Sequence, residues 1–213
     1  MEKPVVIFGA GGLGKAALEI FQSNNVVVYC FLDDNTSLIG TEINGVSVLG
    51  KTDDDEFLKF LGSQSEVFVA LDENKYRKSI VDFLYEEKKV MPINAIHKTA
   101  YISKSANLGH GNLINMSVNV GTGAKIGNHC LLHSRTILDH EAELEDFVQV
   151  GAGSTINAGV KIGKNAFIGS GVTIISGVSV GPGARVGAGS VVVEDVKKNE
   201  TVFGNPAKTV LIQ

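Results

Sequence analysis

Aliphatic residues recur at every sixth position from Ile96 to Val192, and the phase never slips. Two positions before most of them stands a small or β-branched residue, Cys130 among these, and the position just after is glycine in eight of the seventeen hexads. Glycine tolerates a positive φ, so we expect each hexad to form a short strand followed by a corner at that glycine. The pattern also predicts that Cys130 faces inward.

Strands this short need neighbours, because a single hexad cannot bury its own apolar side. Copies stacked about 4.8 Å apart form a parallel β-solenoid. The hexads resemble those of the left-handed β-helix of hexapeptide acyltransferases, in which three hexads complete one triangular coil, and the resemblance supplies the handedness. It implies that residues eighteen apart stack and that the seventeen hexads make between five and six coils. The unbroken phase predicts that no long loop interrupts the solenoid.

The first 95 residues carry a different pattern, in which short apolar runs alternate with amphipathic segments. An apolar strand at 4–8 leads into the glycine turn 9–14, and a helix follows at 15–23. We expect further strands at 26–32, 46–49 and 66–71, and helices at 53–61 and 74–87. The sequence therefore predicts a small Rossmann-like α/β domain at 1–95, followed by the left-handed parallel β-helix at 96–213.

Asp33 and Asp34 end the second strand, about 20 residues after the glycines, where dinucleotide enzymes place the acidic residue that binds ribose hydroxyls. A domain of this size holds only half of such a fold, so we expect a mononucleotide site. Gly11 and Gly12 would let the backbone approach the nucleotide. The alternative is that the glycines only allow the helix to pack closely on the strand.

Composition limits the classes of partner that we expect for this protein. The chain has 213 residues with 19 basic and 23 acidic side chains, and it has no basic block that could bind along a phosphate backbone. We therefore expect no nucleic-acid partner. The apolar run near the N-terminus is too short for a signal peptide or a membrane span, which predicts a cytoplasmic protein without membrane insertion. The two cysteines form neither a disulfide framework nor a CxxC motif.

The hexad pattern breaks its own rule on one coil, where His133, Asp139 and Glu145 occupy three successive corner positions. Such local exceptions tend to mark functional sites. Beside them lies His140, between the carboxylates of Asp139 and Glu141. A carboxylate that binds one imidazole nitrogen fixes the tautomer and raises the basicity of the other, as a general base requires. The alternative is a solvated polar patch.

At these residues the sequence resembles the PglD and NeuD group of acetyltransferases, which modify amino sugars or sialic acid. The shared motifs are the glycine turn, 31–34, 69–74 with Arg77, the hexads and the tail 203–208. The resemblance implies an acetyl-CoA-dependent enzyme in which His140 deprotonates the sugar and Glu141 strengthens it as a base. It also implies that the glycine turn and the Asp33-Asp34 pair hold a uridine nucleotide.

Four residues depart from the family pattern. Leu13 replaces a histidine of the glycine turn and Asp72 replaces a glycine near the nucleotide. Gln149 stands where relatives often have a second histidine, and His133 stands where amino-sugar members have asparagine. We include Leu13, Asp72 and His133 among the substrate-binding residues, and the identity of the sugar is the property that these changes put in doubt.

The mechanism that we expect is direct transfer from acetyl-CoA to a UDP-linked sugar, with no metal. His140 takes the proton of the attacking group, and Glu141 stabilises the imidazolium. The backbone N–H of Ala158, one coil beyond His140, is the candidate donor to the oxyanion.

A flat prism face offers only one wall to an extended thioester, so a neighbouring chain has to supply the second wall. We therefore expect a homotrimer with closed symmetry and three equivalent grooves. The resemblance implies that coenzyme A passes Gln149, Ser170 and Ala188 toward Lys208.

Three alternatives remain open. The acceptor can be a hydroxyl group, as in sialic acid O-acetyltransferases. Some β-helix proteins are zinc hydratases that resemble γ-class carbonic anhydrase, for which His110, His129, His133 and His140 supply candidate ligands. A sugar-nucleotide binder without catalytic activity is the third.

Overall fold

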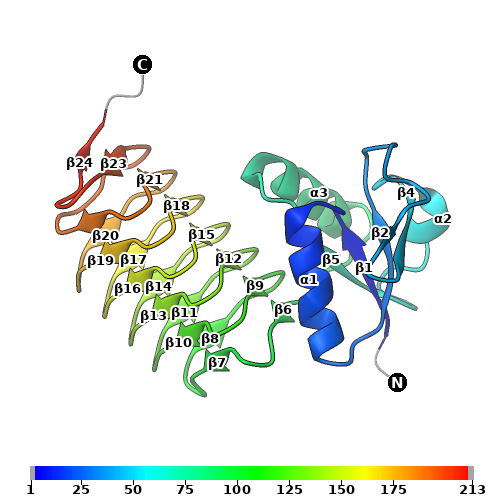
Figure 1. Cartoon of the computed structure of the whole chain (residues 1–213), viewed down its shortest axis with the longest axis horizontal. Helices are drawn as coiled ribbons and strands as arrows, with labels where there is room; N and C mark the ends of the chain where they lie inside the picture. The colour runs from blue at the N-terminus through cyan, green and yellow to red at the C-terminus, as the bar shows by residue number, and fades with distance from the viewer. Residues whose placement is uncertain (1–2, 211–213) are drawn as a thin grey trace. The chain divides into compact units, whose positions relative to one another are not determined.

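The computed structural model describes residues 3–210, and the chain divides into two compact units, Met1–Lys98 and Thr99–Gln213. The first unit is an α/β domain and the second is a parallel β-solenoid (Figure 1). The fold class predicted from the sequence is therefore confirmed. The two units are described separately below.

The first unit contains a sheet whose strand order is β3-β4-β2-β1-β5. In chain order its elements are β1 (Val5–Phe8), α1 (Gly12–Ser23), β2 (Val28–Leu32), β3 (Glu42–Ile43), β4 (Val46–Gly50), α2 (Asp55–Leu58), β5 (Glu66–Val69) and α3 (Asn74–Glu86). The strands β1, β2, β4 and β5 are parallel, and α1 and α2 lie on opposite sides of the sheet (Figure 1). The carboxyl ends of β1, β2 and β5 therefore meet at one edge.

Two helices differ from the expectation, and the short strand β3 was not predicted. The helix after the glycine turn begins at Gly12, three residues earlier than predicted, so its first turn includes Gly12 and Gly14. The predicted helix at 53–61 shortens to α2, where the Asp54 side chain accepts a hydrogen bond from the Glu56 N–H and caps the helix. Apolar periodicity marks the buried side of a helix but does not mark its ends.

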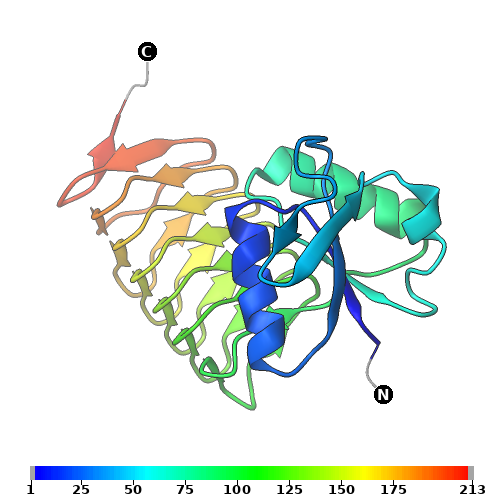
Figure 2. The ribbon, with the colours of Figure 1, turned by 45° about the vertical axis from the view of Figure 1, so that its right-hand side comes forward.

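The solenoid strands fall where the hexads predicted, each ending at an aliphatic residue of the series. After β6 (Ala95–Ile96) they are β7 (Tyr101–Ile102), β8 (Asn107–Leu108), β9 (Leu113–Ile114), β10 (Asn119–Val120), β11 (Lys125–Ile126), β12 (Leu131–Leu132), β13 (Ile137–Leu138), β14 (Glu143–Leu144), β15 (Gln149–Val150), β16 (Thr155–Ile156), β17 (Lys161–Ile162), β18 (Phe167–Ile168), β19 (Thr173–Ile174), β20 (Ser179–Val180), β21 (Arg185–Val186) and β22 (Val191–Val192). The coils follow one another without interruption (Figure 2).

These strands form three faces. Face 1 holds β7, β10, β13, β16, β19 and β22, face 2 holds β8, β11, β14, β17 and β20, and face 3 includes β9, β12, β15, β18 and β21. Stacked residues lie eighteen apart, as Leu131 and Gln149 do. We call the corners between successive faces corner 1–2, corner 2–3 and corner 3–1. The stack ends with β23 (Thr201–Phe203) and the antiparallel β24 (Lys208–Thr209).

The glycines of the hexads have a different reason from the predicted one. Positive φ occurs two residues later, at each corner from Gly111 to Gly189, and that position also accepts Glu141 with φ 58°. The glycine directly after the aliphatic residue is instead required by stacking, because a Cβ on Gly151 would lie 2.4 Å from the Ser170 backbone nitrogen. Coils stacked this closely leave no room for a side chain there.

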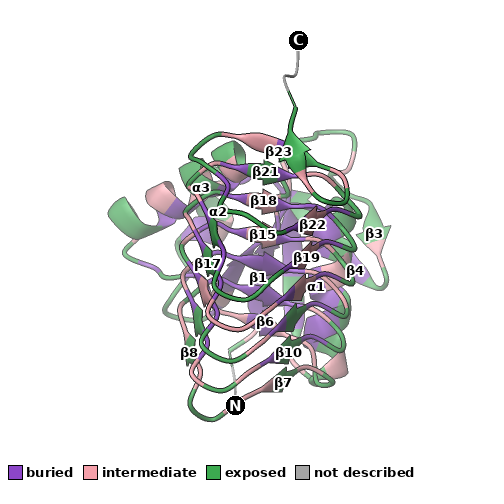
Figure 3. Cartoon of the chain, turned by 90° about the vertical axis from the view of Figure 1, so that its left-hand side faces the viewer, coloured by how far each residue is buried: buried purple, intermediate pink, exposed green. Residues whose placement is uncertain are grey.

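The interior is filled by the aliphatic series and by the small residues two positions earlier (Figure 3). Cys130 is fully buried and faces inward, as predicted. Cys30 is equally buried in β2, and burial raises the pKa of its thiol to about 12. Both cysteines are free thiols that act as core residues.

Candidate active site

The glycine turn at the carboxyl end of β1 contains two kinds of glycine. A Cβ on Gly9 would lie 2.6 Å from the Ala70 carbonyl, and a Cβ on Gly14 would lie 2.0 Å from the Gly9 carbonyl. These two are needed for packing, as the alternative interpretation held. Gly11 and Gly12, by contrast, face open space at the start of α1. The first N–H groups of a helix bind anions, so this opening suits a phosphate.

Asp33 and Asp34 are anchored to the backbone around them. The Asp33 carboxylate accepts a hydrogen bond of 2.7 Å from the Ala10 N–H and thereby holds the glycine turn. One oxygen of Asp34 accepts bonds from the Thr52 N–H at 3.0 Å and the Thr52 hydroxyl at 2.8 Å. Each aspartate keeps acceptor capacity for a ligand.

A cavity of about 430 Å³ lies at this edge of the sheet, and Gly9, Asp33, Asp34, Asp72 and Tyr76 are among its lining residues. Leu13 is not part of the lining, because its side chain is buried in the core with 5% exposure. Only the backbone of Leu13 remains available to a ligand, which revises the predicted role of its side chain.

Arg77 shapes the wall that carries Asp72. Its guanidinium is fully buried and donates hydrogen bonds to the carbonyls of Leu71, at 2.5 Å, and Asp72, at 3.0 Å. A further bond reaches the Asn74 side chain at the start of α3. The sequence marked Arg77 as part of a shared motif, and the structure gives it the task of holding the loop after β5.

His140 stands at corner 1–2, as the second residue after β13. Its ring Nδ1 lies 3.0 Å from an oxygen of Asp139, and the same oxygen accepts a 2.7 Å bond from the His140 backbone N–H. These two contacts, the backbone one first, lower the pKa of Asp139. The His140 side chain is 61% exposed. A carboxylate held on Nδ1 leaves Nε2 directed to the other side of the ring, where a substrate proton can be accepted.

The carboxylate on the ring is therefore Asp139, whereas the resemblance implied Glu141. Glu141 occupies the positive-φ position of the corner, and its backbone N–H bonds the Thr122 carbonyl of the preceding coil at 2.9 Å. The Glu141 carboxylate instead acts on Lys125. The pKa of Lys125 is raised mainly by its hydrogen bond to Glu143, and the charge of Glu141 makes the smallest contribution.

Ala158 stacks one coil beyond His140, as the spacing predicted. Its carbonyl accepts a 2.9 Å bond from the Gly177 N–H, while within residues 3–210 its own N–H donates to no other group. An uncommitted N–H one coil from His140 is the arrangement that an oxyanion donor requires.

The remaining predicted residues lie elsewhere on the prism. His133 belongs to corner 3–1 and is separated from His140 by β13. Ser170 and Ala188 occupy the same corner two and three coils further along the solenoid. Gln149 begins β15 on face 3. Lys208 lies in β24, with its ammonium 3.8 Å from Glu194. A single chain thus does not bring these residues to His140.

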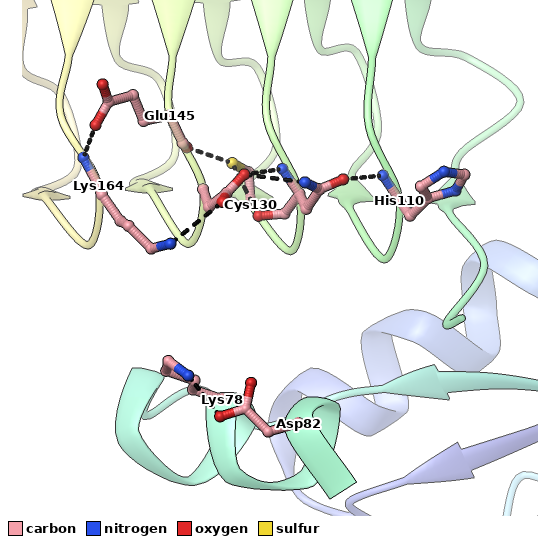
Figure 4. Close-up of polar contacts among 8 residues, drawn as sticks. Lys78, Asp82, His110, Cys130, Glu145 and Lys164 are labelled. Carbon is pink, nitrogen blue, oxygen red and sulfur yellow. Dashed lines mark hydrogen bonds and ion pairs between the residues drawn. The ribbon is translucent and has the colours of Figure 1, made fainter. Parts of the chain in front are cut away.

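Glu145, the third exception to the hexad rule, lies at corner 2–3 and contacts the next coil (Figure 4). Its carboxylate accepts a 2.7 Å bond from the Lys164 backbone N–H of the next coil. In the same column Asp146 accepts bonds from the Asn128 N–H at 2.9 Å and from the Lys164 ammonium at 3.3 Å. This polar column joins successive coils, and it was not predicted because its partners are eighteen or nineteen residues apart in the sequence.

The described part of the chain contains no group of three or more His, Cys, Asp or Glu side chains placed to hold a metal ion. The four candidate histidines of the zinc alternative are spread over all three corners: His110 and His129 share corner 2–3, where His129 is buried against Phe147, while His133 and His140 lie at the other two corners. Among residues 3–210, no helix has the length and apolar character needed to cross a membrane.

The fold and the corner histidine together define a hexapeptide-repeat transferase. The PglD N-terminal domain family matches residues 4–84, and the bacterial transferase hexapeptide family, which describes six repeats, matches residues 141–176 and 159–194. The chain belongs to the PglD-like family of hexapeptide-repeat acetyltransferases.

Three similar proteins are acetyltransferases by name. GDP-perosamine N-acetyltransferase of Escherichia coli O157:H7 is 31% identical over 170 residues, which cover 76% of this chain and 73% of the relative. A histidine-to-alanine variant of the Caulobacter crescentus GDP-perosamine N-acetyltransferase, solved with CoA and GDP-perosamine, is 30% identical with a TM-score of 0.89, covering 98% of this chain and 97% of that one. The acetyltransferase domain of PglB from Neisseria gonorrhoeae FA1090, with acetyl coenzyme A, is 30% identical with a TM-score of 0.91, covering 99% and 100%.

Proposed function

We propose that the protein transfers the acetyl group of acetyl-CoA to the amino group of a nucleotide-linked sugar, with His140 as the general base. The observation that carries the proposal is the His140–Asp139 pair, in which a carboxylate holds Nδ1 of an exposed imidazole. Relatives that bear the name N-acetyltransferase, and a solved relative that contains CoA and a nucleotide sugar, support the same reaction.

In the proposed reaction the sugar nitrogen attacks the thioester carbonyl while Nε2 of His140 takes a proton from that nitrogen. Asp139 stabilises the imidazolium that forms, and Glu141 adds negative charge from the other side of the corner. The Ala158 N–H donates to the oxyanion. The carbon–sulfur bond then breaks, and the imidazolium returns its proton to the departing thiolate, which leaves as CoA.

The nucleotide is assigned to the cavity beside β1, with its phosphates at Gly11 and Gly12. Four carboxylates line that cavity, those of Asp33, Asp34, Asp72 and Glu73. Guanine presents N1–H and an exocyclic amine to such acceptors, whereas uracil presents one N3–H. Together with the GDP-sugar relatives, this favours guanine over the uracil expected from the sequence.

The trimer expected from the sequence gains support from the outward residues of face 1. They are all uncharged, namely Tyr101, Asn119, Ile137, Thr155, Thr173 and Val191, and both Tyr101 and Ile137 are exposed apolar side chains. Face 2 instead carries charged residues such as Lys125 and Glu143, which form an ion pair of 2.8 Å. An uncharged face next to corners 1–2 and 3–1 is suited to contact another chain.

The deciding experiment incubates the purified protein with acetyl-CoA and GDP-, UDP- or CMP-linked sugars that carry either a free amine or only hydroxyl groups. Release of CoA thiol and a product heavier by one acetyl group are measured. We expect turnover with an amino sugar, fastest with a GDP-linked one. Acetylation of hydroxyl-only sugars would instead support the sialic acid alternative. Calorimetric titration with GDP and UDP, repeated with Asp34→Ala, locates the nucleotide, and that substitution should weaken binding.

The remaining alternatives predict different results. A hydratase would contain stoichiometric zinc by elemental analysis, and a binder without catalytic activity would bind the nucleotide sugar yet release no CoA. Either result would refute the proposed transfer.

A further inference from the structure

Three inward positions of corner 3–1 carry hydroxyl groups, while the intervening positions Val118 and Val172 are apolar. Thr136, Ser154 and Ser190 are all fully buried. The equivalent positions of corner 1–2 are filled by apolar residues such as Ala142 and Val160. Since a buried hydroxyl must be hydrogen-bonded, these three groups need a purpose that an alanine or valine would not serve.

Each hydroxyl donates to a corner carbonyl. Thr136 bonds the His133 carbonyl at 2.7 Å, Ser154 bonds the Gly169 carbonyl at 2.9 Å, and Ser190 bonds the Gly187 carbonyl at 2.7 Å. The N–H on the other side of each of these peptide groups belongs to Ser134, Ser170 or Ala188. Because the carbonyl is held inward, the N–H of the same planar peptide group is turned outward.

These outward N–H groups are uncommitted. Within residues 3–210 the N–H groups of Ser134, Ala152, Ser170 and Ala188 donate no hydrogen bond. At corner 1–2 the equivalent column is interrupted at His140, whose N–H donates to Asp139, and at corner 2–3 Glu145 accepts from the N–H of Lys164. Corner 3–1 thus has an unbroken column of available N–H donors from Ser134 to Ala188, and the residues that carry these N–H groups have small side chains.

The hydroxyls also join hydrogen-bond chains. Ser154 accepts from the Val172 N–H at 3.2 Å while it donates to Gly169, and Ser190 accepts from the Gly204 N–H of the tail at 3.0 Å. Successive hydrogen bonds polarise one another, so a peptide group whose carbonyl accepts such a bond becomes a stronger N–H donor.

We infer that Thr136, Ser154 and Ser190 are positioning residues for the acetyl donor, because they orient and polarise the N–H column that receives the two amide carbonyls of the pantetheine arm of coenzyme A. This inference rests on the proposed function. None of the three hydroxyls touches the reacting atoms, so they affect binding of the donor and leave the chemical step unchanged.

The test measures the KM for acetyl-CoA, kcat, and calorimetric affinity for CoA in Thr136→Val, Thr136→Ser, Ser154→Ala and Ser190→Ala. We expect the KM of Thr136→Val, Ser154→Ala and Ser190→Ala to rise about 3- to 10-fold with kcat nearly unchanged, in line with the loss of one hydrogen bond. Thr136→Ser keeps the hydroxyl and should bind CoA like the wild-type protein. Thr136→Val preserves the side-chain volume better but lacks the hydroxyl, so the pair separates the effect of the hydroxyl from that of packing.

Cys130→Ala provides the matched control, since Cys130 is an equally buried inward residue whose thiol donates to the Glu145 carbonyl at 3.1 Å on corner 2–3. It should leave the KM for acetyl-CoA unaltered. Unaltered KM in Thr136→Val and Ser154→Ala, or an equal rise in Cys130→Ala, would overturn the inference. Failure of the wild-type protein to bind CoA would overturn the proposed function itself.

Discussion

His140 owes its chemistry to its place in the corner. It is the second residue after a strand, where the side chain leaves the prism and the backbone N–H has no partner in the next coil. Asp139 supplies that partner and with the same oxygen reaches the imidazole. One carboxylate thus completes the corner and orients the ring.

Replacing His140 with alanine should lower kcat/KM by about 10² to 10⁴, the usual contribution of a general base. The side chain is 61% exposed, so the thermal unfolding midpoint should not change. Steady-state kinetics with acetyl-CoA and the identified sugar check the prediction. Near-normal turnover would remove His140 from the mechanism.

The roles of the two carboxylates beside His140 can be distinguished by replacing each one with its amide. Asp139→Asn should lower kcat more than Glu141→Gln does, because only Asp139 contacts the ring in the structure. An asparagine also favours the wrong imidazole tautomer, since its amide can donate to Nδ1. Stopped-time assays of both variants at several pH values provide the comparison. A larger loss in Glu141→Gln would restore the role that the family resemblance implied.

At the scale of the element, a coil depends on the contacts that its corners make with the next coil. Asp146 is the centre of the polar column at corner 2–3. Burial acts to raise its pKa, but the Asn128 N–H and the Lys164 ammonium outweigh that effect and the pKa is lowered. Its ionised form therefore stabilises the folded solenoid.

Asp146→Asn should reduce the free energy of unfolding by about 1 kcal/mol at pH 7. A lowered pKa means that the wild-type advantage is complete above the unfolded-state value of 3.8 and is lost as the pH falls through the folded-state value. Urea unfolding of both proteins between pH 7 and pH 3 measures this difference. An advantage that grows on acidification would be inconsistent with the assignment.

Asp82→Asn is the control for this measurement. Asp82 forms an exposed pair with Lys78 on α3, four residues apart (Figure 4). Such pairs contribute about 0.3–0.5 kcal/mol, so its removal should be barely detectable at any pH tested.

At the scale of the whole molecule, the uncharged face 1 and the dispersed site residues lead to the same assembly. The proposed trimer has a mass of about 67 kDa, three times the 22.5 kDa chain. Ile137→Glu places a charge on face 1 and should convert the trimer into inactive monomers by light scattering. Ser179→Glu, on the charged face 2, should leave mass and activity unchanged. An active Ile137→Glu monomer would refute the shared groove.

Co-expression of two inactive variants tests whether each site is shared between chains. His140→Ala lacks the base, and Ala188→Trp blocks corner 3–1, where Ala188 is exposed. If a base from one chain serves the groove of another, random mixed trimers should regain about a quarter of wild-type activity. If both parts of a site came from one chain, the mixture would stay inactive.

The periodic features of this protein could be read from its sequence. The positions of the solenoid strands, the inward direction of Cys130 and the stacking of Ala158 on His140 follow from a fixed spacing of six. Each hexad buries the same kind of residue at the same step, so local pattern and global fold agree. The glycine turn and β2, which ends just before Asp33, were visible instead as a short apolar run bounded by turn residues.

The choice of Asp139 as the imidazole partner was decided by the tertiary structure, because both neighbours of His140 are acidic and only the corner geometry separates them. The positions of positive φ, the packing role of Gly151 and the burial of Leu13 likewise depend on what the next coil or strand places nearby. The Ser154 hydroxyl reaches a carbonyl fifteen residues away, and Asn128 and Asp146 are eighteen residues apart. Those contacts exist only once the coils stack, since stacking fixes the distance between the partners.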